Sequence, residues 1–134
     1  MSTESATPLP ADPAPADLFR ALADETRLRA VALLRAEGEL CVCELTEALA
    51  ISQPKMSRHL ASLRELGIVA GRRDGLWIHY RIAPELPHWV VHTLAAACGG
   101  LADRAPFRDD RERLATMVKR AGNRCLAPVG EDGS

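Results

Sequence analysis

Long hydrophobic runs are absent from this chain of 134 residues. Nothing in it approaches the roughly 18 consecutive apolar residues that a helix needs to cross a bilayer, so we expect no membrane partner. Residues 1–16 have neither the basic start nor the apolar stretch of a secretory signal. These two absences predict a cytoplasmic protein.

The chain also lacks the sequence motifs of common enzymes. It has no glycine-rich phosphate-binding loop, no nucleophile elbow and no zinc-hydrolase motif. We therefore predict that the protein is not an enzyme, has no catalytic residue and uses no catalytic cofactor.

Cysteine is scarce, with four residues in the whole chain. They are Cys41, Cys43, Cys98 and Cys125, and residues 1–40 contain none. A chain that is not exported does not keep a disulfide framework. These side chains are therefore expected to be reduced thiols or metal ligands.

Charge is unevenly distributed, although the formal net charge is only −1. Between positions 52 and 82, six basic residues face two acidic ones, a local balance of +4. The basic residues are Lys55, Arg58, Arg64, Arg72, Arg73 and Arg81. Such a patch suits a polyanion such as DNA, although an ordinary solvated surface would have the same composition.

The length predicts one domain with a modest core. Residues 1–15 are rich in Pro, Ala, Ser and Thr and are predicted to form a disordered N-terminal arm. Residues 123–134 are predicted to form a flexible tail. The folded domain is therefore expected over residues 16–122.

Apolar periodicity and turn residues predict the elements of this domain. Helices are expected over about 17–22, 26–36, 42–50, 53–66, 88–98 and 108–120. Gly99-Gly100 is expected to weaken or end the fifth of them. Two strand-forming runs, 68–73 and 76–82, flank Asp74-Gly75, which is a strong hairpin signal. This order predicts a mainly α fold with a β-hairpin, the winged helix-turn-helix.

Two motifs stand at the starts of the second and fourth predicted helices. One is Asp24-Glu25-Thr26-Arg27-Leu28-Arg29, and the other is Ser52-Gln53-Pro54-Lys55-Met56-Ser57-Arg58-His59-Leu60-Ala61-Ser62-Leu63-Arg64, followed by Gly67-Ile68-Val69. As a set they resemble the ArsR/SmtB family of small bacterial metal-responsive repressors, over about residues 18–98. The resemblance implies a homodimer formed by the first and fifth helices. It also implies that the dimer holds operator DNA with an imperfect inverted repeat and that an inducer releases it.

In such a fold the fourth helix reads the major groove with its N-terminal residues. The polar residues of its first two turns lie opposite an apolar stripe, and they are Gln53, Lys55, Ser57 and Arg58. Because Gln can pair with adenine and Arg with guanine, we predict that these residues contact bases or nearby phosphates. Arg72 and Arg73 are predicted to contact the DNA backbone or minor groove from the hairpin. His59 is expected to be structural.

Cys41 and Cys43 are the candidate metal ligands. Thiolates suit soft ions, and the segment Glu39–Leu45 resembles the arsenite-responsive branch of the family. The resemblance therefore implies arsenite, an organoarsenical or antimonite as inducer. Residues i and i+2 do not face one another on a regular helix, but they share a side in extended backbone. The pair can therefore hold one ion only if the start of the third helix is distorted or unwound. The alternative is that both are small buried side chains.

Close arsenite-responsive relatives often carry a third cysteine at the position of Thr46. Cys125 could supply a third ligand, whereas Cys98 is expected to pack at an interface. With two ligands alone, the site would favour a monosubstituted arsenical. His88 and His92 share a helix face but give too few ligands for zinc. A repressor that answers to cadmium, to lead or to thiol oxidation remains the alternative function.

Overall fold

The computed structural model describes residues 13–121. Its helices are α1 (Pro15–Leu22), α2 (Glu25–Glu37), α3 (Val42–Leu49), α4 (Gln53–Glu65), α5 (His88–Leu101) and α6 (Phe107–Ala121). Its strands are β1 (Glu39–Cys41), β2 (Val69–Asp74) and β3 (Trp77–Ile82). The mainly α fold with a β-hairpin is confirmed. Among the described helices, none is long and apolar enough to cross a membrane.

The helix boundaries follow from local capping. The Asp24 carboxylate accepts a hydrogen bond from the Arg27 backbone N–H at 3.0 Å and caps α2, which ends at Gly38 with a φ of 96°. Helix α1 begins at Pro15, so the expected arm is one residue too long at that end. Proline is well suited to the first turn of a helix because its fixed φ is helical.

The three strands form an antiparallel sheet in the order β1-β3-β2. Strand β1 was not predicted, because three residues are too few to show an alternating pattern. The hairpin turn lies one residue later than expected, since Asp74 pairs with Trp77 and leaves Gly75 and Leu76 as the loop. Gly75 has a φ of 65°, as the first central residue of a type II′ turn requires.

Helices α3 and α4 form the helix-turn-helix. Their inner faces are fully buried and consist of Leu45, Ala48, Leu49, Met56, Leu60 and Leu63. The turn between them contains Ala50, whose φ of 57° is left-handed, and then Ser52, the N-cap of α4. This turn sets the direction in which α4 leaves α3.

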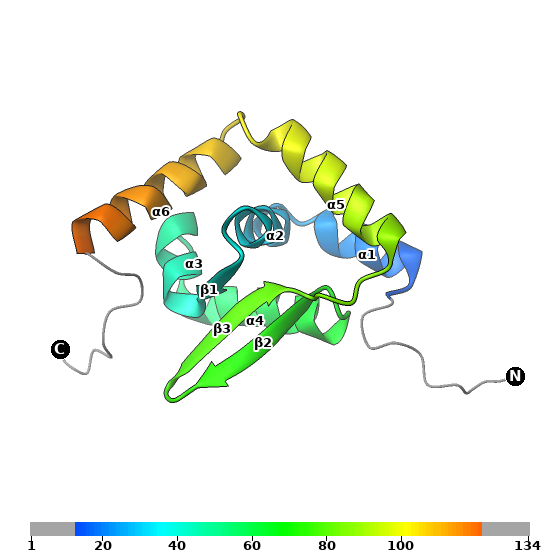
Figure 1. Cartoon of the computed structure of the whole chain (residues 1–134), viewed down its shortest axis with the longest axis horizontal. Coiled ribbons are helices and arrows are strands. Elements are labelled where there is room, and N and C mark those ends of the chain that lie inside the picture. The colour runs from blue at the N-terminus through cyan, green and yellow to red at the C-terminus, as the bar shows by residue number, and fades with distance from the viewer. Residues whose placement is uncertain (1–12, 122–134) are drawn as a thin grey trace, which may run out of the picture.

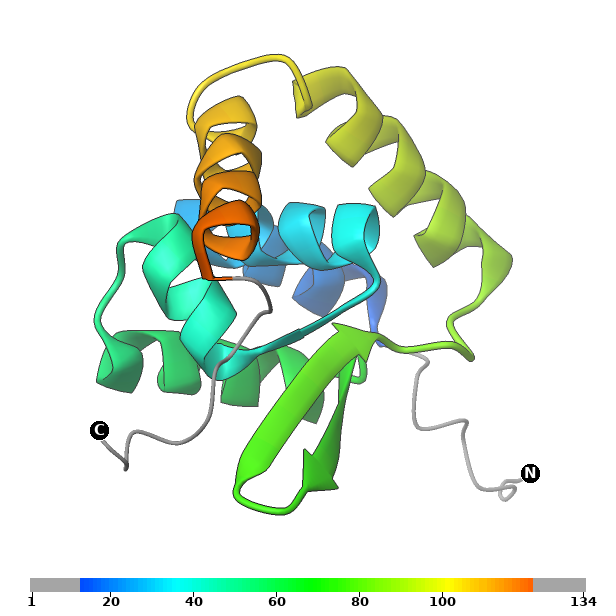
Figure 2. The same ribbon diagram turned by 60° about the vertical axis from the view of Figure 1, so that its left-hand side comes forward.

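The last two helices cover the face of α2 that lies away from the hairpin (Figure 1). Helix α5 buries Val90, Leu94 and Cys98, while α6 lies against α2 and α3. Gly99-Gly100 was expected to weaken or end the fifth helix, and the second alternative is wrong, because α5 continues to Leu101. Each glycine costs only about 1 kcal/mol in a helix, so two of them do not have to end it. Figure 2 shows the hairpin projecting away from the helices as a wing.

Candidate functional site

The side chains of Cys41 and Cys43 meet at the start of α3. Cys41 is the last residue of β1 and the N-cap of α3, with extended backbone angles of φ −87° and ψ 166°. Cys43 lies in the first turn, and the two Sγ atoms are 2.6 Å apart. The distortion expected of the helix start is not needed, because the extended residue precedes a regular helix. The structure therefore brings the two sulfurs together, as a shared ion would require.

Glu44 completes the end of the helix beside this pair. Its Oε1 accepts a hydrogen bond from the Cys41 backbone N–H at 2.8 Å, and its side chain is buried. This contact is one half of a capping box, in which the glutamate at the third helical position accepts from the backbone N–H of the N-cap residue. This role of Glu44 was not predicted, although a glutamate three residues after the N-cap is its usual signal.

The described residues do not supply an assembled third ligand. Over positions 13–121, no group of three His, Cys, Asp or Glu side chains is placed to hold a metal ion. Thr46 donates its hydroxyl to the Val42 carbonyl at 2.6 Å, so it faces its own helix. Cys125 lies outside the described residues.

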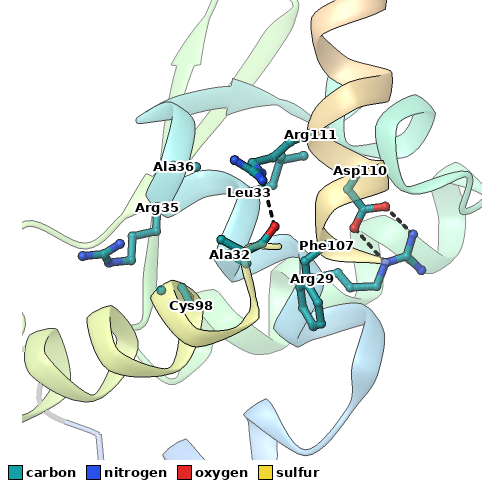
Figure 3. A pocket seen from close by; sticks show the side chains of 11 residues that line it. Arg29, Ala32, Leu33, Arg35, Ala36, Cys98, Phe107, Asp110 and Arg111 are labelled. Atoms are coloured by element: carbon teal, nitrogen blue, oxygen red, sulfur yellow. Dashed lines mark hydrogen bonds and ion pairs between the residues drawn. The ribbon is translucent and has the colours of Figure 1, made fainter. Parts of the chain in front are cut away.

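Cys98 belongs to a different part of the molecule. It lines a cavity of about 110 Å³ between α2, α5 and α6, together with Ala32, Leu33 and Phe107 (Figure 3). Burial raises the pKa of its thiol, which therefore stays protonated near neutral pH. Its side chain packs inside the chain's own core.

His88 and His92 are exposed and stack on α5, with ring centroids 6.2 Å apart. Two histidines are fewer than the four ligands that a structural zinc site needs.

The predicted DNA-reading residues share one exposed face of α4. Gln53, Lys55, Ser57 and Arg58 are all exposed, whereas the opposite face of the helix is buried in the core. His59 lies at the edge of the buried face, with its Nδ1 3.3 Å from Arg27 Nη1 and 3.9 Å from Asp24 Oδ2. This contact joins α4 to the start of α2 and agrees with a structural role.

The two wing arginines differ from one another. Arg73 is exposed near the tip of the hairpin. Arg72 donates hydrogen bonds from Nη2 and Nε to the Glu39 carboxylate, at 2.7 and 3.2 Å. This ion pair was not predicted, because the partners lie 33 positions apart in the sequence. Arg72 therefore has a structural contact that competes with any contact to DNA.

Known proteins resemble this chain in both fold and sequence. Residues 24–70, from α2 into β2, match the family model described as "Bacterial regulatory protein, arsR family". The arsenic resistance transcriptional regulator ArsR1 of Pseudomonas putida is 51% identical over 115 residues, covering 86% of this chain and 85% of that protein. The chain belongs to the ArsR family.

Two further relatives extend the comparison. The arsenical resistance operon repressor of Escherichia coli is 54% identical over 105 residues, which are 78% of this chain and 82% of that protein. The solved structure of the AntR antimony-specific transcriptional repressor matches with a TM-score of 0.56 at 32% identity, covering 66% of this chain and 77% of that one. This ArsR-family protein is a winged helix-turn-helix transcriptional regulator that binds DNA, and it is not an enzyme.

Proposed function

We propose that this ArsR-family protein represses an arsenic-resistance operon and leaves its operator when trivalent arsenic or antimony binds Cys41 and Cys43. The observation that carries this proposal is the meeting of two sulfur atoms, 2.6 Å apart, at the start of the first helix of the helix-turn-helix. The names of the relatives in Pseudomonas putida and Escherichia coli support the same inducer class.

Release follows from linkage between two binding equilibria. An ion that holds both sulfurs fixes the junction of β1 and α3 in one geometry. If the DNA-bound state disfavours that geometry, the ion and the operator weaken each other's binding by the same factor. Two thiolates satisfy a monosubstituted arsenical. Inorganic arsenite takes a third ligand, for which Cys125 or a small exogenous thiol is our candidate.

An operator with an inverted repeat is bound by two copies of the chain. We propose that α1 and α5 form the homodimer interface, since Phe19, Trp89 and Val91 are exposed apolar residues on these helices. Phe19 and Trp89 lie together, with ring centroids 6.5 Å apart. A two-fold dimer places its two α4 helices on the half-sites of an inverted repeat, about 34 Å apart. The cytoplasm, where such an operon lies, is the expected location.

Fluorescence anisotropy on labelled promoter DNA tests the inducer. The reduced native chain is titrated with arsenite, phenylarsine oxide, cadmium, zinc and hydrogen peroxide. We expect release by the arsenicals, loss of that release in Cys41→Ser and Cys43→Ser, and normal release in the matched control Cys98→Ala. Release by cadmium or peroxide alone, with none by either arsenical, would replace our proposal by the cadmium or oxidation alternative.

A further inference from the structure

Asp110 on α6 is a carboxylate with only 1% of its surface exposed. It accepts hydrogen bonds from Arg29 Nε and Nη2, at 2.9 and 2.7 Å, and from Arg113 Nη2 at 3.0 Å. Figure 3 shows the carboxylate of Asp110 facing the guanidinium of Arg29 across the gap between α6 and α2. The hydrogen bond to Asp110 raises the pKa of Arg29 above its ordinary value, which favours the charged guanidinium.

The two arginines also reach the end of α3. Arg29 Nη2 donates to the Leu49 carbonyl at 3.0 Å, and Arg113 Nε donates to the Ala48 carbonyl at 2.7 Å. The last carbonyls of a helix have no partner within it, so cationic donors are favoured there. Ala50, which follows directly, holds the left-handed backbone of the turn into α4.

We propose that Asp110, Arg29 and Arg113 position the turn of the helix-turn-helix, so that α6 sets the pose in which α4 meets DNA. Arg29 and Arg113 hold the final carbonyls of α3, and Asp110 holds both arginines. The thiol pair lies at the other end of the same helix, which has only eight residues. Helix α3 is thus held at one end by α6 and, on the proposed function on which this inference rests, fixed at the other end by the inducer.

Arg113 is the best residue to test, because its side chain is 45% exposed and its loss leaves Asp110 paired with Arg29. Arg113→Ala is compared with Arg108→Ala, a matched control on the same helix whose contacts are with Asp109 and the Asp103 carbonyl. Asp110→Asn is the second variant. Thermal unfolding followed by circular dichroism identifies a temperature at which the native chain and all three variants are folded.

Anisotropy then gives the affinity for operator and for random DNA over a range of salt. Arg113→Ala removes a charged hydrogen bond and so lowers the fraction of molecules in the conformation that binds DNA. We therefore expect its operator affinity to be about three- to tenfold weaker. We expect random-DNA affinity and the salt slope to stay native, because α6 lies on the far side of α3 from α4 (Figure 1). Asp110→Asn should act in the same direction and Arg108→Ala should be native. A native ratio of operator to random-DNA affinity in folded Arg113→Ala overturns the proposal.

A second readout concerns the inducer. Arg113→Ala is expected to shift the protein towards the conformation that does not bind the operator. It should therefore leave the operator at a lower concentration of phenylarsine oxide than the native chain. An unchanged or higher concentration counts against a role of α6 in release. If the native chain itself ignores arsenicals, the proposed function fails, while the affinity ratio still decides whether α6 positions α4.

Discussion

Arg72 on β2 and Glu39 on β1 form an ion pair at 2.7 Å that spans the outer face of the sheet. The Arg72 guanidinium holds the pKa of the Glu39 carboxyl below its ordinary value. Strand β1 ends at Cys41. The wing is thereby tied to the segment that ends in the thiol pair.

This pairing predicts different roles for the two wing arginines. Arg73→Ala should weaken DNA binding and reduce the salt slope by about 1, because an exposed arginine near a phosphate releases one counterion. Arg72→Ala should change the slope less, since its guanidinium is bound to Glu39. Binding isotherms on one duplex at several salt concentrations check this difference. Equal changes in slope for both variants would show that Arg72 leaves Glu39 when DNA binds.

The exposed face of α4 predicts sequence-specific reading by Arg58. Arg58→Ala should weaken operator binding by about 1–3 kcal/mol and relax the preference at one base pair, if the side chain pairs with guanine. Arg64→Ala is the control, because Arg64 is exposed on the same helix but near its C-terminal end. Competition with a set of single-base operator variants measures the preference. Weakening of operator and random DNA alike would instead make Arg58 a phosphate contact.

The Asp24 cap predicts a stability change that depends on pH. Hydrogen bonding from the Arg27 backbone N–H lowers the pKa of Asp24, so its stabilising contribution is complete above the ordinary carboxyl value and is lost as pH falls through the lower folded-state value. Asp24→Ala should cost about 1 kcal/mol at pH 7. Urea unfolding in steps from pH 7 towards about pH 3 should show that this cost shrinks with acid. Asp24→Asn keeps the cap without the charge and should retain most of the stability, whereas a cost in Asp24→Ala that is constant with pH would contradict the assigned cause.

The exposed aromatic pair predicts a dimer that depends on α5. Trp89→Ala should raise the dimer dissociation constant by about 30-fold, because removing a central aromatic residue from an interface costs at least about 2 kcal/mol. Sedimentation velocity over a range of concentrations measures this shift. Leu76→Ala is a suitable control, since Leu76 is 80% exposed at the tip of the wing. A native chain that sediments as a monomer would refute the proposed interface.

Much of the fold was predictable because its signals are local. Asp24 and Ser52 cap their helices, Gly38 ends α2, and the stripe of Met56, Leu60 and Leu63 is buried as its spacing indicates. The pattern around Asp74-Gly75 also placed the hairpin to within one residue. These features depend on residues within a turn or two of each other, where backbone geometry leaves few choices.

The sequence by itself determined the family, the position of the helix-turn-helix and the placement of two cysteines at its start. Only the tertiary structure decided that Cys41 ends a strand, that Arg72 is bound to Glu39, and that Asp110 joins α6 to the turn after α3. The partners in the last two cases are 33 and 81 positions apart. The periodicity of a sequence does not reveal contacts between residues so far apart in the chain. Such contacts form only when the packing of helices and strands brings distant side chains together.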